Sequence, residues 1–112
     1  MNLTIKDNLN AKIVKSELDA FLVVKEANIR YITGFAGDSA YAAVNASGIT
    51  LFVNSLYIEH ARASVHTSIH IREIKDGLFE TFASLGKSFW GKRIGLEGDA
   101  TCSFLSKFRD AI

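Results

Sequence analysis

The chain reads Asn28-Ile29-Arg30-Tyr31-Ile32-Thr33-Gly34-Phe35 directly after a short, mainly apolar run at residues 19–24. That run is too short for a typical helix, and its apolar residues do not alternate with polar ones. This pattern predicts a strand that is buried on both faces. Asn28 tolerates turn conformations and can bond nearby backbone, so it suits the exit from this strand.

The large rings of the same stretch predict that the next loop has a defined shape. Tyr31 and Phe35 can anchor the chain to the core through their rings. Gly34 and Gly37 permit backbone angles that other residues resist. We therefore expect the loop at residues 36–40 to be held in place by its flanking residues.

Outward from this stretch, hydrophobic periodicity predicts alternating helices and strands. Residues 41–44 and 49–53 are expected to form an antiparallel hairpin around Asn45-Ala46-Ser47-Gly48. Leu78, Phe82, Leu85 and Phe89 form one apolar stripe of a helix that Gly91 ends. The remaining expected elements are a helix over residues 2–16, a helix over 55–65 capped by Ser55, strands at 69–73 and 93–97, and a last helix capped by Asp99 or Thr101. This order predicts an α/β domain with a mixed sheet of five or more strands and helices on both faces.

Composition narrows the class of protein. The 112 residues are enough for one domain, 48% of them are hydrophobic, and the net charge is +1. A charge so close to balance does not favour binding to nucleic acid or to an anionic membrane. The single cysteine, Cys102, excludes an internal disulfide. We expect no signal peptide, because residues 1–7 lack a basic start and an apolar core, and no membrane span, because the longest apolar run is too short. We expect a cytoplasmic protein.

No catalytic residue and no metal ligand can be assigned from motifs. His60, His66 and His70 lie close in sequence, but no H-E-x-x-H or paired-cysteine pattern accompanies them, so they are interpreted as surface or boundary residues. Asp38-Ser39 lacks the G-x-S-x-G nucleophile elbow, because Tyr41 stands where the second glycine would be. Cys102 is expected to be a half-buried structural thiol.

The opening stretch closely resembles the N-I-R-Y-L-T-G-F signature of the N-terminal domain of Xaa-Pro aminopeptidases, prolidases and creatinase. Other segments are similar to the family pattern in the same order, so the resemblance covers nearly the whole chain. They are Leu18-Asp19-Ala20-Phe21-Leu22-Val23, Ser47-Gly48-Ile49-Thr50-Leu51-Phe52, Tyr57-Ile58-Glu59-His60-Ala61, Ile74-Lys75-Asp76-Gly77-Leu78 and Ile94-Gly95-Leu96-Glu97-Gly98-Asp99. Asn28, Arg30, Tyr31, Gly34, Phe35 and Tyr57 are the signature residues carried over.

The resemblance implies a creatinase N-terminal-domain fold with a ribonuclease H-like motif, over residues 1–112 and truncated near its C-terminal end. It implies that a catalytic pita-bread domain, absent from the chain, follows. There, two Asp, one His and two Glu hold two divalent ions (Mn, Co or Zn) that activate water. Implied partners are this catalytic domain, a second subunit in a homodimer, and, for the parent enzyme, a proline-containing peptide substrate.

The resemblance also implies a role for the loop after Gly34-Phe35. In family dimers, this loop approaches the partner's active site, so Phe35, Gly37, Asp38, Ser39 and Tyr41 are predicted to help close a substrate pocket. The chain itself is expected to be non-catalytic and its parent a metal-dependent Xaa-Pro peptidase. Two alternatives stay open: an interaction module of a relative that has lost catalysis, and a creatinase-like amidinohydrolase parent.

One departure from the family pattern bears on these alternatives. Many members have D-S-R-Y where this chain has Asn54-Ser55-Leu56-Tyr57. An acid and an arginine are therefore both replaced. Arg30 or Arg62 could substitute for that arginine.

Overall fold

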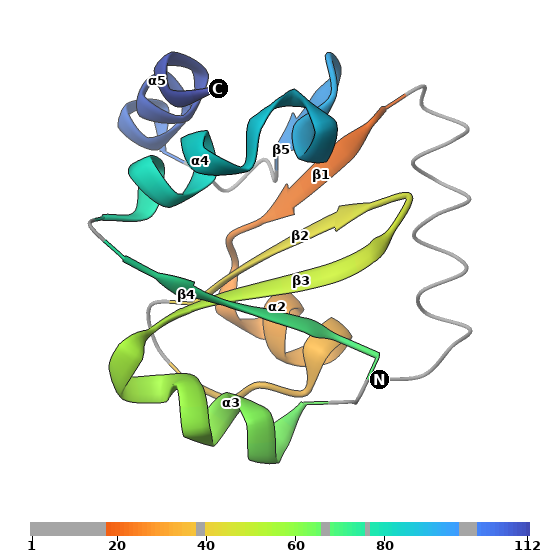
Figure 1. Ribbon diagram of the computed structural model, residues 1–112, viewed down its shortest axis with the longest axis vertical. Coiled ribbons are helices and arrows are strands. Elements are labelled where there is room, and N and C mark those ends of the chain that lie inside the picture. Colours follow the sequence, from red (N-terminus) through yellow and green to blue (C-terminus); the bar gives the residue numbers. More distant parts are fainter. Residues whose placement is uncertain (1–17, 38–39, 66–67, 76, 97–100) are drawn as a thin grey trace.

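The computed structural model describes residues 18–37, 40–65, 68–75, 77–96 and 101–112, which form a five-stranded mixed sheet with helices on both faces (Figure 1). This confirms the predicted α/β class. The expected helix over residues 2–16 lies outside the described residues. The elements in chain order are β1 (Ala20–Val23), α2 (Glu26–Thr33), β2 (Tyr41–Asn45), β3 (Gly48–Asn54), η1 (Ser55–Tyr57), α3 (Ile58–Ser64), β4 (His70–Ile74), α4 (Leu78–Trp90), β5 (Ile94–Leu96) and α5 (Cys102–Ala111).

The sheet has the strand order β4-β3-β2-β1-β5. The predicted hairpin is confirmed: β2 and β3 pair antiparallel, with Val44 opposite Ile49. β1 joins β2 antiparallel and β5 in parallel, whereas β4 joins β3 in parallel. β1 is therefore an interior strand, and its buried residues confirm the expectation of a strand covered on both faces.

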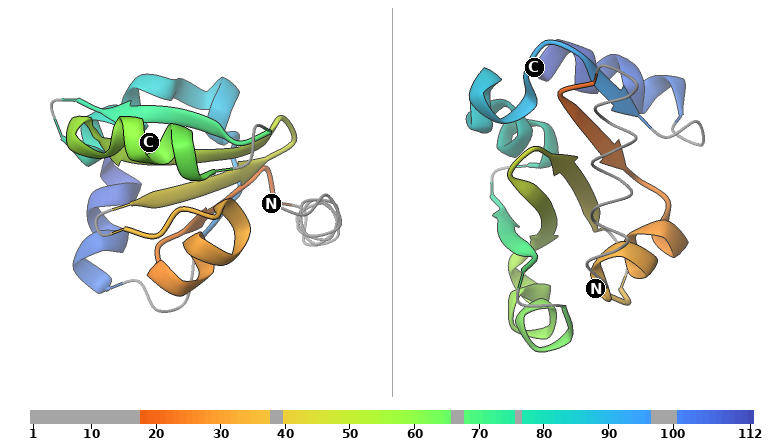
Figure 2. Two further views of the ribbon diagram at one scale, coloured as in Figure 1. Left: turned by 90° about the horizontal axis from the view of Figure 1, so that it is seen from below. Right: turned by 90° about the vertical axis from the view of Figure 1, so that its right-hand side faces the viewer.

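Helices cover the two faces of the sheet in pairs. In Figure 1, α4 and α5 lie above the sheet and α2 and α3 below it, and the views of Figure 2 agree. Each face has its own core cluster. We call the one under α2 and α3 the lower cluster, with Ile29, Ile32, Phe35, Leu51 and Ala61 among its members, and the one under α4 and α5 the upper cluster, with Leu22, Phe52, Phe82, Trp90 and Phe108. Burying each large apolar side chain contributes roughly 1.5–3 kcal/mol relative to leaving it exposed.

The signature stretch is helical, which the sequence reasoning missed. α2 occupies Glu26–Thr33, so Asn28 lies within a helix and not in a turn at the exit of β1. Ile29, Ile32 and Thr33 are its buried residues, a spacing that places them on one face against the sheet. An isolated helix of eight residues would be marginal in water, so this packing is what stabilises it.

The helix α4 follows the predicted apolar stripe but is interrupted at one residue. Gly86 has φ 71° and ψ −177°, a conformation that is essentially restricted to glycine. Across this kink, the Trp90 indole Nε1–H donates to the Phe82 carbonyl at 2.8 Å. The Asn45 amide donates to the Phe89 carbonyl at 3.1 Å, which ties the end of α4 to the hairpin. Gly91 ends the helix, as predicted.

Two helix caps and the burial of Cys102 were predicted, and the structure confirms only part of these predictions. Asn54, not Ser55, is the cap: its side chain accepts from the Leu56 N–H at 3.1 Å and starts the turn η1 ahead of α3. The Thr101 hydroxyl accepts from the Phe104 N–H at 3.1 Å, so the expected cap of α5 is confirmed. Cys102 is exposed, and the prediction of a half-buried thiol is wrong because α5 turns Phe104 and Phe108 toward the core.

Among the described residues, no helix combines the length and the apolar character that crossing a bilayer would require.

Candidate functional site

The loop after α2 begins at a helix end that only glycine fits well. Gly34 has φ 84°, in the left-handed region, and its N–H donates to the Arg30 carbonyl at 2.8 Å. A side chain at this position would also lie 3.3 Å from the Ser64 carbonyl of α3. Gly34 thus ends α2 in close contact with the end of α3.

A buried hydroxyl fixes the turn from α2 into the loop. The Thr33 hydroxyl donates to the Ile29 carbonyl at 2.7 Å and accepts from the Phe35 N–H at 3.1 Å. Thr33 is fully buried, so these bonds satisfy groups that water cannot reach. Sequence reasoning did not single out Thr33, although its place before a Gly-Phe pair was a usable signal.

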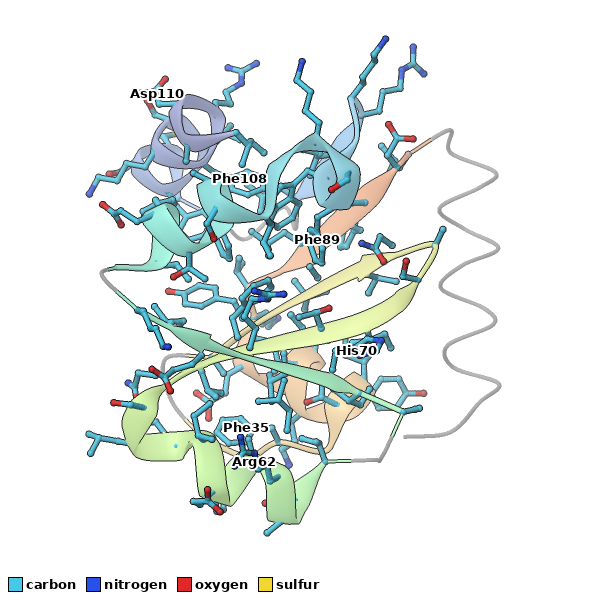
Figure 3. The ribbon with its side chains drawn as sticks, in the orientation of Figure 1. Phe35, Arg62, His70, Phe89, Phe108 and Asp110 are labelled. Atoms are coloured by element: carbon cyan, nitrogen blue, oxygen red, sulfur yellow. The ribbon has the colours of Figure 1, made fainter. Side chains whose placement is uncertain are left out.

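Phe35 is the anchor that the sequence predicted. Its side chain is 1% exposed, and its ring packs edge-on with Tyr57 and His60 at centroid distances of 6.3 and 5.3 Å. Figure 3 shows Phe35 between the sheet and α3. Gly37 folds back over this ring so closely that an added side-chain carbon would lie 2.8 Å from it. The structure therefore brings Phe35, Gly37 and Tyr57 together.

Tyr41, at the other end of the loop, belongs to the opposite face of the sheet. Its ring stacks on Phe104 at 5.7 Å and meets Phe82 edge-on at 6.3 Å, both in the upper cluster. The loop at residues 36–40 thus connects the lower cluster with the upper one. Asp38 and Ser39 lie outside the described residues, and their predicted role stays a prediction.

The other signature residues lie at the surface. Tyr31 is 68% exposed, so the expectation that its ring anchors the loop is wrong. Asn28 and Arg30 are also exposed on α2.

The position at which the family pattern has arginine is a solvent-exposed leucine. Leu56, in η1, is 86% exposed. Of the two arginines considered as substitutes, Arg62 pairs with Glu59 of its own helix at 3.0 Å. Both partners are exposed, so this ion pair contributes little to stability.

The histidines do not form a metal centre in the part of the chain that is described. No group of three or more His, Cys, Asp or Glu side chains there is placed to hold a metal ion. His60 lies on α3 against the Phe35 ring, whereas His70 begins β4. His66 lies outside the described residues.

Asp19 is a structural carboxylate whose role the sequence did not reveal. Its Oδ2 accepts from the backbone N–H groups of Lys92 at 2.7 Å and Arg93 at 2.9 Å. These two bonds lower the pKa of the Asp19 carboxyl below its ordinary value, and the bond from Arg93 has the larger effect. Asp19 thereby joins the start of β1 to the segment that enters β5.

Fold and loop together define a class: an α/β domain with a firmly anchored loop and no metal-binding cluster among its described residues. The sequence profile of the Creatinase/Prolidase N-terminal domain matches residues 6–112. The chain belongs to this family.

Individual relatives agree with this assignment. The chain is 31% identical over 80 residues to the uncharacterized peptidase YqhT of Bacillus subtilis (strain 168). These aligned residues cover 71% of this chain and 22% of that protein. The N-terminal domain of the cytoplasmic peptidase PepQ from Mycobacterium tuberculosis H37Rv superposes with a TM-score of 0.80 at 28% identity, covering 94% of this chain and 82% of that one. The Xaa-Pro dipeptidase from Bacillus anthracis shares the fold, with a TM-score of 0.84 at 23% identity over 95% of this chain. This chain covers only 30% of that dipeptidase chain.

Proposed function

We propose that this chain is the non-catalytic N-terminal domain of a Xaa-Pro-cleaving metallopeptidase, either an aminopeptidase or a dipeptidase. The observation that carries the proposal is the family match across residues 6–112, together with a similar peptidase of which the chain spans 22%. In this proposal, a separate pita-bread domain binds the two divalent ions and the proline-containing substrate. The parent works in the cytoplasm.

The anchored loop supports a role in closing the active site of a partner subunit. Thr33 and Phe35 fix the start of the loop in the lower cluster, and Tyr41 fixes its end in the upper one. A loop held at both ends presents its residues at low entropic cost, which favours substrate positioning over bond cleavage. Phe35, Gly37 and Tyr41 are then positioning residues, and Asp38 and Ser39 are proposed to help close the substrate pocket.

Apolar surface between α4 and α5 supports docking of the catalytic domain of the same chain. A groove of about 630 Å³ lies there, lined by Trp90, Leu96, Leu105 and Ile112 among others. Leu105 and Ile112 are large apolar side chains that remain exposed. An exposed apolar patch of this kind is typical of an interaction surface.

A peptidase assay on the purified chain tests the first part of the proposal. With added manganese or cobalt, the chain is expected to release no product from a Xaa-Pro dipeptide or from creatine. Turnover that a chelator abolishes would contradict a non-catalytic role. Determining the gene sequence beyond the Ile112 codon tests the parent, because a continuation without the Asp-Asp-His-Glu-Glu ligand set would rule out a metallopeptidase.

The exposed Leu56 favours a second candidate, an interaction module of a relative that has lost catalysis. An apolar side chain at 86% exposure replaces the family's arginine, which removes a charge that a catalytic dimer could use. A binding screen with the purified chain separates the two candidates. If the chain binds nothing except itself, the interaction module is disfavoured.

A further inference from the structure

The groove between α4 and α5, here called the α4–α5 groove, has an aromatic floor on which an apolar side chain can lie. Trp90 and Phe108 line it and are only 1% and 3% exposed. Their rings meet edge-on at a centroid distance of 5.2 Å, and Figure 3 shows Phe108 between the two helices. Both rings belong to the upper cluster, so the packing of the core fixes the floor of the groove.

The walls of the groove leave room for such a side chain. Gly86 lines it at the kink of α4, and an added side-chain carbon there would meet nothing within 4 Å. On the α5 side, Leu105 and Ile112 also line the groove and remain exposed. Removing this apolar surface from water favours binding of an apolar group.

The rim of the groove is basic. Lys87 in the last turn of α4, Lys92 just after it and Arg109 on α5 all line the groove and are exposed. No Asp or Glu is among the described residues that line it. Within the described part of the chain, Lys87 and Arg109 have no ion-pair partner, whereas Lys92 also attracts the Asp19 carboxyl. A basic rim is complementary to an acidic partner and repels a basic one.

We propose that the α4–α5 groove binds an acidic segment with apolar anchors. The apolar side chains of this segment lie on the aromatic floor, and its carboxylates pair with Lys87, Lys92 and Arg109. The inference rests on the proposed function, because it assigns this chemistry to the part of the catalytic domain that docks here. The buried floor favours a protein segment over an anionic membrane, since an apolar side chain must enter the groove to reach Trp90 and Phe108.

A titration of the isotope-labelled chain with three blocked hexapeptides tests this inference. The first peptide has a central leucine-phenylalanine pair with two glutamates on each side. Lysines replace the glutamates in the second peptide, and two alanines replace the central pair in the third. Trp90 is the single tryptophan, so its indole N–H gives one signal that reports on the floor of the groove.

We expect the Trp90 indole signal to shift on addition of the glutamate peptide. This peptide should bind about ten-fold more tightly than the lysine peptide, as expected for a few partly exposed ion pairs. It should also bind about ten-fold more tightly than the alanine peptide, because the two anchors bury apolar surface.

Three variants at exposed positions separate the charge from the apolar contact. Arg109→Glu should weaken binding of the glutamate peptide about five-fold and strengthen binding of the lysine peptide. Leu105→Ser should weaken binding of both peptides and leave the ratio of their affinities unchanged, because it removes apolar surface and no charge. Arg30→Glu makes the same charge change on α2, at the opposite face of the sheet, and should alter either affinity by less than about two-fold.

Equal binding of the glutamate and lysine peptides, or equal effects of Arg109→Glu and Arg30→Glu, would overturn the inference. A Trp90 signal that shifts with the concentration of the chain alone would also overturn it, because a second copy would then occupy the groove. The gene sequence beyond the Ile112 codon keeps the two proposals apart. A metal-ligand set there, without a charge preference among the peptides, rules out this inference alone. The expected preference without a ligand set rules out the proposed function, and with it the assignment of the acidic segment to a catalytic domain.

Discussion

Comparing Phe35→Ala with Tyr31→Ala tests which part of the signature stretch stabilises the fold, the buried part or the exposed one. Phe35 is 1% exposed and its ring contacts Tyr57 and His60. Phe35→Ala is expected to lower the free energy of unfolding by about 3–5 kcal/mol, the range for truncation of a buried phenylalanine. A domain of this size has a total stability of about 5–15 kcal/mol, so the loss is large. Tyr31→Ala, at 68% exposure, should change it by less than about 0.5 kcal/mol.

Urea unfolding followed by tryptophan fluorescence measures both variants. Trp90 is the single tryptophan, is buried, and belongs to the upper cluster, whereas Phe35 belongs to the lower one. If the two clusters unfold as one unit, the transition of Trp90 shifts by ~2 M urea for Phe35→Ala, given a slope of about 1–3 kcal/mol per molar. Equal shifts for the two variants would refute the reasoning. The reasoning would also be refuted if Phe35→Ala lowered the unfolding midpoint measured by circular dichroism but left the midpoint measured by Trp90 fluorescence unchanged. The two clusters would then unfold independently.

Three further outcomes follow from single contacts. Thr33→Val should cost about 1–3 kcal/mol because it leaves the Phe35 N–H buried without a partner, and Thr33→Ser should restore most of the loss; equal unfolding midpoints for the two variants would contradict this. Gly86→Ala should cost about 1–3 kcal/mol from backbone strain alone, since an added side-chain carbon there meets nothing within 4 Å; a midpoint as high as that of the unchanged chain would exclude the kink. The lowered pKa of Asp19 means that its contribution is present above the unfolded pKa near 3.8 and is lost as the pH falls through the lower folded pKa. Asp19→Asn should therefore flatten the fall in unfolding free energy below about pH 4, and an identical acid limb in both proteins would count against that assignment.

Much of the sheet was predictable because its signals are local. The turn at Asn45-Ala46-Ser47-Gly48 and the apolar runs beside it specified the hairpin, and the stripe through Phe82 and Phe89 specified α4. The sequence did not reveal α2, because a two-turn helix with Ile29 and Ile32 has weak intrinsic propensity and depends on packing against the sheet.

The candidate site was predictable only in part, for the same physical reason. That Phe35 is an anchor follows from its size and its place after a glycine, but Tyr31, equally large, points to solvent. Tyr31 lies within α2, a helix that the sequence did not reveal, and its exposure follows from the face of that helix on which it stands, whereas Phe35 lies beyond the end of α2.

The part of the signature stretch that holds the fold together is therefore Thr33-Gly34-Phe35 and not its first half. These residues end α2, place a ring against α3 and start a loop whose other end, Tyr41, is fixed in the opposite core cluster. Because both clusters hold the loop, a change in either core should alter the position of residues 36–40. A role in positioning substrate would then be sensitive to core substitutions far from any substrate. If the chain is part of the proposed metallopeptidase, that sensitivity would appear as a loss of activity without a change at any metal ligand, and it would distinguish a positioning loop from a passive connection.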